Sequence, residues 1–138
     1  MASIRNQIIK SFAAKIGAER ALKFATGDRL PLRVLWDFTE EAERTKYSTH
    51  TVVLPVVVQE MIEAEKGQDE GDLLDSTLLA LQENVFSVDA TLDALVKSIT
   101  YAGSDYTYSE NGSSLVGISA SFIIKYEFLT NDPTNQGT

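Results

Sequence analysis

The sequence contains few residues that could carry out catalysis, and the spacing of these residues argues against an active site. His50 is the only histidine, and no motif links it to a serine or a carboxylate. A Ser-His-Asp arrangement requires a nucleophile, a base and an orienting acid, and the residues around His50 support none. Because the sequence contains no cysteine, it offers no thiol nucleophile, thiolate ligand or disulfide. We expect His50 to be a surface strand residue and the protein not to be an enzyme.

An acidic cluster at Asp69, Glu70, Asp72 and Asp75 supplies the oxygen ligands that a hard cation prefers. Its spacing does not match a twelve-residue calcium loop, which has a glycine at its centre and a glutamate at its end. Acidic side chains are also favoured at a helix N-terminus, where they face the positive end of the helix dipole. We interpret the cluster as a solvated linker that leads into a helix, and we expect neither a metal nor a cofactor.

Three tyrosines near the C-terminus, Tyr101, Tyr106 and Tyr108, are candidates for binding. Tyrosine rings can stack on nucleic acid bases, but no basic residues are interleaved with these three. Tyrosine is also enriched in cross-strand pairs and in protein interfaces, and both of these interpretations remain open. We predict that the three tyrosines, together with Glu110 and Asn111 in the turn that follows, form part of a subunit or partner interface.

The composition indicates one globular domain with an acidic surface. A chain of 138 residues, of which 43% are apolar, can bury a sizeable core. The net charge of −8 argues against nucleic acid binding through a broad basic face, and it would repel DNA that the protein only surrounds. Solubility alone would also explain this charge. The sequence has neither the apolar segment of a signal peptide nor an apolar run near ~18 residues, so we expect folding in the cytoplasm and no membrane contact.

The elements that would position these residues begin with an amphipathic helix. Apolar residues from Ile4 to Ile16 recur at helical spacing, with Ser3 as the expected N-cap and Gly17 as the C-terminal stop. A second helix is expected after the linker Lys66–Asp72, with Asp72 as its N-cap. Its apolar residues are Leu74, Leu78, Leu81 and Val85. The segment Asp89–Val96 predicts a shorter helical turn.

Strands are predicted between and after these helices. Leu32–Phe38 predicts a short strand, and Thr49–Ala64 a long one with an apolar middle. Pro55 lacks a backbone N–H, so it indicates an edge position or a bulge within the long strand. The polar segment Thr39–Ser48 between the two strands either extends a hairpin or forms a mobile loop.

The last third of the sequence predicts a long β-hairpin, formed by Leu95–Tyr108 and Leu115–Phe128. From Val116 onward, apolar residues alternate with mostly polar ones, which is typical of a strand with one buried face. Asn111-Gly112 is a strong hairpin signal, because both central residues of a type I′ turn need positive φ. A strand of about 14 residues spans about 46 Å, whereas a compact domain of this length is roughly 37 Å across. We therefore expect the hairpin to extend beyond its own core and to meet a neighbouring subunit.

Together these elements predict an α+β fold. The short connections favour a mostly antiparallel sheet over regular βαβ units. We expect two main helices to pack on one face of this sheet, and the long C-terminal β-hairpin to complete it.

The C-terminal block also shares a pattern with a known protein family. The residues that carry this pattern are Leu92–Val96, Ile99-Thr100-Tyr101, Gly103, Tyr108, Glu110-Asn111-Gly112, the run from Gly117 to Tyr126, and Asp132-Pro133. This block resembles the tail terminator (tail completion) proteins of tailed bacteriophages. The earlier elements follow the order expected for that family. One departure is the turn before the final hairpin, which contains Asp93-Ala94 where the family is expected to have small residues or glycine. The likeness implies a single tail-terminator-like domain over residues 1–133, and the polar composition after Leu129 predicts a flexible tail over 134–138.

The resemblance implies a structural role in the virion. Proteins of this family form rings, typically hexamers, that cap the tail tube, end its polymerisation and join the tail to the head connector. The expected partners are copies of this chain, the tail tube protein, the head-tail connector protein and the tail sheath, with DNA only passing through the lumen. The expected location is the tail or neck of the virion, after assembly in the host bacterial cytoplasm. Further interface candidates lie in the polar segment, at Glu40, Glu41, Arg44, Lys46 and Tyr47.

Two other interpretations remain open from the sequence. A head-completion or connector protein, or a tail tube protein of the neck, would share the ring symmetry. A small soluble module that binds a ligand or a host protein would instead place the aromatic residues around a pocket.

Overall fold

The computed structural model describes residues 3–20, 32–46, 49–129, 132 and 134, without the side chains of residues 44–46. Its described residues form three helices and a six-stranded, mostly antiparallel sheet, which confirms the predicted α+β class. The elements are α1 (Ile4–Ile16), β1 (Glu19–Arg20), β2 (Leu32–Asp37), β3 (Glu41–Lys46), β4 (Thr49–Glu63), α2 (Glu70–Phe86), α3 (Ala90–Leu95), β5 (Ser98–Thr107) and β6 (Leu115–Leu129). The strand order is β1-β2-β4-β6-β5, with β3 also paired to β4, and only β1 and β2 are parallel.

The central pair of the sheet consists of β4 and β6, which are paired over all fifteen residues from Thr49↔Leu129 to Glu63↔Leu115. Along β6 the expected face is buried from Val116 to Tyr126, and the polar residues between them are mostly more exposed. The alternation predicted from the sequence is therefore confirmed. With β5 paired to β6, the C-terminal β-hairpin is also confirmed.

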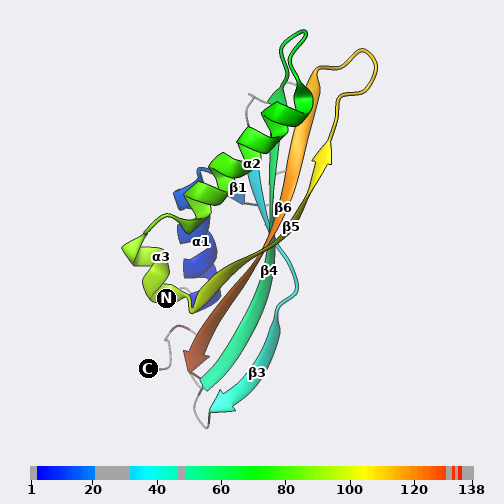
Figure 1. The fold of residues 1–138 in the computed structure, drawn as a ribbon. Coiled ribbons are helices and arrows are strands. Elements are labelled where there is room, and N and C mark those ends of the chain that lie inside the picture. Colours follow the sequence, from blue (N-terminus) through cyan, green and yellow to red (C-terminus); the bar gives the residue numbers. More distant parts are fainter. Residues whose placement is uncertain (1–2, 21–31, 47–48, 130–131, 133, 135–138) are drawn as a thin grey trace.

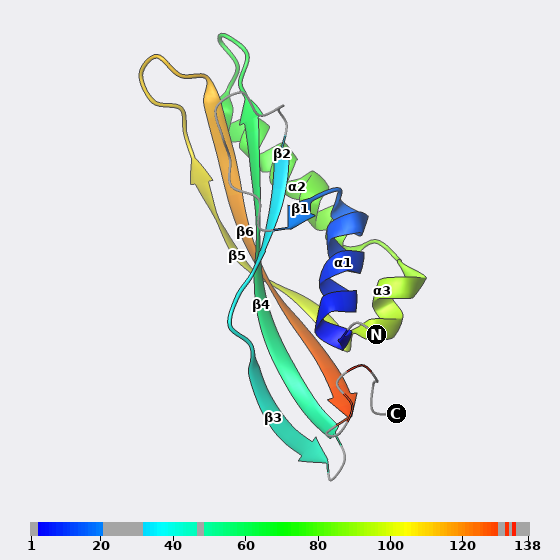
Figure 2. The same ribbon diagram turned by 180° about the vertical axis from the view of Figure 1, so that it is seen from behind.

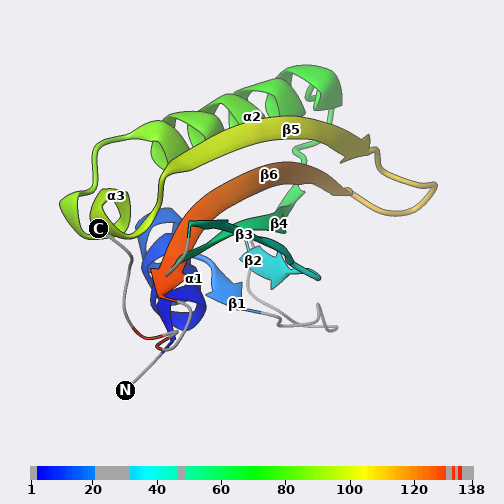
Figure 3. The same cartoon turned by 90° about the horizontal axis from the view of Figure 1, so that it is seen from below.

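All three helices lie on one face of the sheet (Figures 1 and 3). The caps of α1 are those expected: the Ser3 side chain accepts from Asn6 N–H at 3.1 Å, and Gly17 follows the helix with φ 64°. The buried residues of α1 and α2 pack on the inner face of β4 and β6 to form the core. Its largest fully buried side chains include Phe12, Phe122, Tyr126, Leu74, Leu81 and Ile124.

The sheet extends beyond the helices at one end (Figures 1 and 2). There β3 pairs with the first residues of β4, and the last residues of β6 pair with the other side of β4. We call this three-stranded extension the distal arm, defined by Glu41–Lys46, Thr49–Val53 and Lys125–Leu129. Of the two structures predicted for the polar segment after β2, the segment thus forms the extended hairpin. Tyr47 and Ser48 lie outside the described residues.

The expected edge position of Pro55 is wrong, because β4 is an internal strand and Pro55 pairs with Ile123 of β6. On its other side, the pairing with β2 ends at Val56 and the pairing with β3 starts at Val53. The Pro55 carbonyl accepts from Phe38 N–H at 3.1 Å in this break. Since a residue's N–H and C=O point to the same side of an antiparallel strand, the missing N–H faces this break, and the pairing of Pro55 with β6 is not affected.

Two local predictions also need correction. The N-cap of α2 is Asp69, which accepts from the N–H of Asp72, so the helix begins within the predicted linker. The hairpin loop runs from Tyr108 to Ser114, and is therefore longer than a two-residue turn. Within it, Ser113 N–H donates to Glu110 O at 2.9 Å, and Gly112 has φ 81°.

Candidate assembly surfaces

The candidate tyrosines of β5 face α2. The hydroxyl of Tyr106 donates to Asp75 Oδ1 at 2.6 Å, and this hydrogen bond raises the pKa of Tyr106 to about 12. The ring of Tyr101 lies 5.7 Å from that of Phe122, between centroids, and its hydroxyl donates to Ser104. Both tyrosines are half-buried, so each contributes to packing within the subunit.

The hairpin loop presents the remaining candidates of this group. Tyr108 is 54% exposed and contacts the ring of Tyr106 edge-on, with 6.4 Å between centroids. The loop is attached to α2, because Ser109 donates to the Glu70 carboxylate from both its N–H and its hydroxyl. These two hydrogen bonds lower the pKa of Glu70. Glu110 and Asn111 are exposed, so they are available to a partner at this end of the sheet.

Glu40 lies between β2 and β3, inside a polar cluster that attaches the base of the distal arm to α1. Its carboxylate accepts from the Tyr126 hydroxyl at 2.5 Å and lies 3.3 Å from Arg5 Nη1. Arg5 also contacts Asp37 at 2.9 Å. Burial and the hydrogen bond to Glu40 raise the pKa of Tyr126, because both favour its neutral form.

Asp37 joins this cluster to β1. Arg20 donates to both of its carboxylate oxygens, at 3.0 and 2.9 Å, and Arg5 adds a third hydrogen bond. The hydrogen bond from Arg20 is the largest cause that lowers the pKa of Asp37 to about 2. Sequence analysis missed this cluster, because its members lie 17 and 32 positions apart and only the tertiary fold brings them together.

The other candidates of the polar segment lie on or next to β3. Glu41 is exposed and stands opposite Val53 of β4. Arg44 and Lys46 belong to the same strand, paired with His50 and Thr49, but their side chains lie outside the described part of the structure. Tyr47 is likewise not described. Among the described strands, none pairs with the outer edge of β3.

The sheet has a second open edge on its opposite side. β5 pairs with β6 from Ser98 to Thr107, and no described strand pairs with its other side. An open edge presents unpaired backbone N–H and C=O groups that a strand from another chain can bind. Among the described strands, the outer edges of β3, β5 and the short β1 are therefore unpaired, and β3 and β5 are two candidate binding surfaces on different sides of one subunit.

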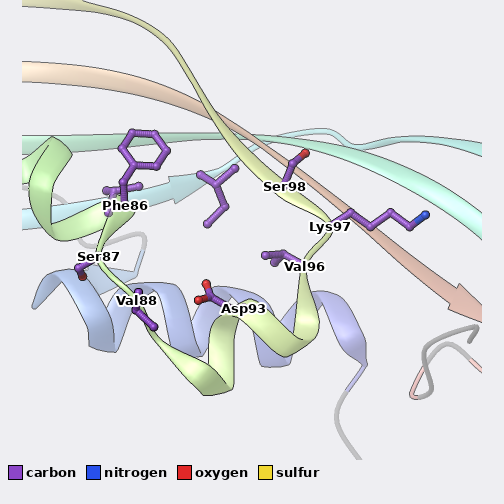
Figure 4. A pocket seen from close by; sticks show the side chains of 9 residues that line it. Phe86, Ser87, Val88, Asp93, Val96, Lys97 and Ser98 are labelled. Carbon is purple, nitrogen blue, oxygen red and sulfur yellow. The ribbon is translucent and has the colours of Figure 1, made fainter.

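A pocket of about 250 Å³ lies beside the start of β5, at its junction with the end of α2 and with α3. Figure 4 shows Phe86, Val88 and Val96 around it, with Lys97 extending away. Phe86 is 50% exposed and Val88 is 92% exposed, so part of the rim is apolar, while Ser87, Asp93, Lys97 and Ser98 also line the pocket. Lys97 forms an ion pair with the buried carboxylate of Glu127 in β6. The sequence carried no signal for this pocket, since the residues that line it come from three elements.

The structure also bears on His50, on metal binding and on membrane-spanning helices. His50 is a half-buried residue of β4 whose ring stacks on Phe128, with 5.2 Å between centroids. Within the described part of the chain, no three His, Cys, Asp or Glu residues are grouped as a metal site. None of the described helices is long and apolar enough to cross a membrane.

Of the three comparisons with known proteins, the one with solved structures gives matches. No family model and no curated protein matches the chain. Among solved structures, a chain of the "Virion of native gene transfer agent (GTA) particle" is similar, with a TM-score of 0.42 and 14% identity. The similarity covers 91% of this chain and 92% of that chain. A likeness at this level does not decide the function.

Proposed function

We propose that this protein is a structural virion protein that forms a ring on the end of a phage tail tube, as a tail terminator. The observation that carries the proposal is the pair of open strand edges, β3 and β5, on opposite sides of one sheet. The resemblance of the C-terminal block to tail terminator proteins supports the same function.

Two different open edges on one subunit favour head-to-tail association. Each copy can offer β5 to a neighbour on one side and β3 to a neighbour on the other, and such heterologous contacts close into a ring when the rotation allows it. The distal arm lies beyond the helices, and its exposed residues, such as Glu41, Glu43 and Lys125, are available to the tube or to the connector. The net charge of −8 suits a ring whose lumen lets DNA pass without binding it.

Electron microscopy of the purified chain, alone and mixed with tail tubes, tests this function. We expect rings of about six copies, formed alone or on the tube end, and tubes that stop elongating once capped. A protein that stays monomeric and leaves tube ends bare would contradict the proposal. Pull-downs with separate tube and connector proteins distinguish a terminator, which binds both, from a tube protein or a head-completion protein.

A further inference from the structure

An exposed aromatic residue and a partly apolar pocket lie on opposite sides of the sheet. Phe38, at the end of β2, is 50% exposed, and its N–H donates to the Pro55 carbonyl. Pro55 pairs with Ile123, which pairs with Thr100 of β5. This row of the sheet therefore runs from Phe38 to the start of β5, where the pocket formed by α2, α3 and β5 lies. Thr100 directly follows Ile99, which lines the pocket, so Phe38 and the pocket lie on neighbouring rows of the sheet.

Charges of opposite sign lie a few rows from Phe38, with acidic residues on β3 and lysines near the start of β5. Glu41 of β3 pairs with Val53, and Val53 pairs with Lys125 of β6. Two rows further along the distal arm, Glu43 lies on the row of Glu127, the residue that binds Lys97. The β3 edge thus presents two exposed acidic residues, Glu41 and Glu43. Near the start of β5 lie two exposed lysines: Lys97, which is paired with Glu127, and Lys125 of the internal strand β6.

We propose that the pocket beside β5 is the socket for Phe38 of a neighbouring copy, with Glu41 and Glu43 of that copy facing Lys97 and Lys125. The inference rests on the proposed ring function and names the contact that closes the ring. A cavity of roughly 150 Å³ can bind benzene, so a pocket of about 250 Å³ accommodates a phenyl ring.

The similar positions of Phe38 and the pocket along the strand direction favour a closed ring. A head-to-tail contact repeats one rotation and one translation from copy to copy. Because Phe38 and the pocket lie on neighbouring rows, joining them shifts the next copy little along the strand direction. Rotation without such a shift gives a closed ring and no open helical filament.

Disulfide trapping tests the contact directly, because the chain has no cysteine of its own. We would prepare full-length Phe38→Cys and Val88→Cys proteins, mix them, and oxidise them at a concentration where the wild type forms rings. The inference predicts a disulfide-linked dimer in the mixture, at least tenfold more abundant than in either protein alone. Leu79→Cys is the matched control for Val88→Cys, since Leu79 is also exposed but lies in α2, outside the residues that line the pocket. Equal yields with Leu79→Cys would overturn the inference.

Charge reversal gives a second and independent readout. Glu41→Lys and Lys125→Glu should each raise the concentration for half-assembly at least fivefold, and the double variant should recover most of that loss. Circular dichroism of each variant confirms that it is folded. One outcome is that the wild type forms rings that cap tubes while neither disulfide trapping nor charge reversal has an effect. In that case the proposed contact between Phe38 and the pocket is wrong, and the proposed function stands. If specific trapping occurs but tubes stay uncapped, the contact stands and the tail function fails; a monomeric wild type without trapping contradicts both.

Discussion

The hydroxyl of Tyr126 donates a hydrogen bond to Glu40 over 2.5 Å, although the two residues are 86 positions apart. Tyr126 is on the inner face of β6 and is 2% exposed, whereas Glu40 lies between β2 and β3. Arg5 of α1 contacts the same carboxylate. This contact holds the base of the distal arm against the helix layer.

Replacing Tyr126 with Phe should therefore destabilise the protein without creating a large cavity. A hydrogen bond to a charged group contributes about 1.5–3 kcal/mol, and because Glu40 is partly exposed we expect a loss of about 1–2 kcal/mol. Urea unfolding at one fixed protein concentration measures it, since assembly adds stability by mass action. Tyr106→Phe is the matched control: its partner Asp75 is exposed, so the loss should be smaller. An equal effect of both substitutions would contradict the proposed role of Tyr126.

Asp37 predicts a dependence of stability on pH. The guanidinium groups of Arg20 and Arg5 hold its pKa at about 2 in the folded state, below the value near 3.9 of an unfolded chain. A carboxyl with a lowered folded pKa stabilises the fold above pH ~4, and that contribution is lost as the pH falls towards 2. We expect Asp37→Asn to lower the unfolding free energy at pH 7 by roughly 1–2 kcal/mol, after allowance for solvent screening.

The pH series itself provides the check on Asp37. The difference between wild type and Asp37→Asn should shrink between pH ~4 and 2, because the wild-type carboxyl then also becomes neutral. Asp105→Asn, an exposed acid on β5, serves as the control and should follow the wild-type curve. A difference between wild type and Asp37→Asn that stays constant down to pH 2 would show that Asp37 acts through packing alone.

Most of the fold could be predicted from local patterns. Ser3 and Gly17 mark the ends of α1, and the alternation from Val116 identifies β6, because capping and burial of one strand face leave signals within a few residues. Pro55 led to a wrong prediction of an edge position. The internal strand β4 accommodates it at a break between the pairings with β2 and β3, and the sequence does not reveal this break. Asp69 and Asp72 are equally good N-caps, so the start of α2 could not be decided locally.

The candidate surfaces were less predictable. Tyr101 and Tyr106 were expected at an interface, and the structure brings them against Phe122 and Asp75 of their own subunit. Whether they also contact a partner stays a prediction. The pocket beside β5 depends on how three elements meet, and no short-range pattern encodes such a junction.

Lys15 should stabilise the end of α2 from a neighbouring helix. Its ammonium group donates to the carbonyl oxygens of Val85, at 2.8 Å, and Ser87. These carbonyls lie at the C-terminal end of α2, where the helix dipole favours a positive charge. We expect Lys15→Met to cost about 1–2 kcal/mol in urea unfolding. Lys10→Met, an exposed lysine of the same helix, should change stability by less than about 0.5 kcal/mol. Similar losses for both lysines would indicate a general charge effect.

Phe122 connects β6 to three other elements of the fold. From β6 its ring contacts those of Phe12 in α1, Phe86 in α2 and Tyr101 in β5, with centroids 6.3, 6.1 and 5.7 Å away. Phe122→Ala should cost roughly 3–5 kcal/mol, because it removes a fully buried ring and leaves a cavity.

The comparison with Phe38→Ala separates folding from assembly. Phe38 is half exposed, so its truncation should cost less than about 1 kcal/mol in a monomer. If the socket is correct, the same substitution should nevertheless raise the concentration needed for assembly. Urea unfolding at a concentration below assembly, paired with native mass spectrometry above it, measures the two effects. A large loss of monomer stability in Phe38→Ala would mean that Phe38 serves its own fold, and its exposure would then no longer favour an intersubunit role.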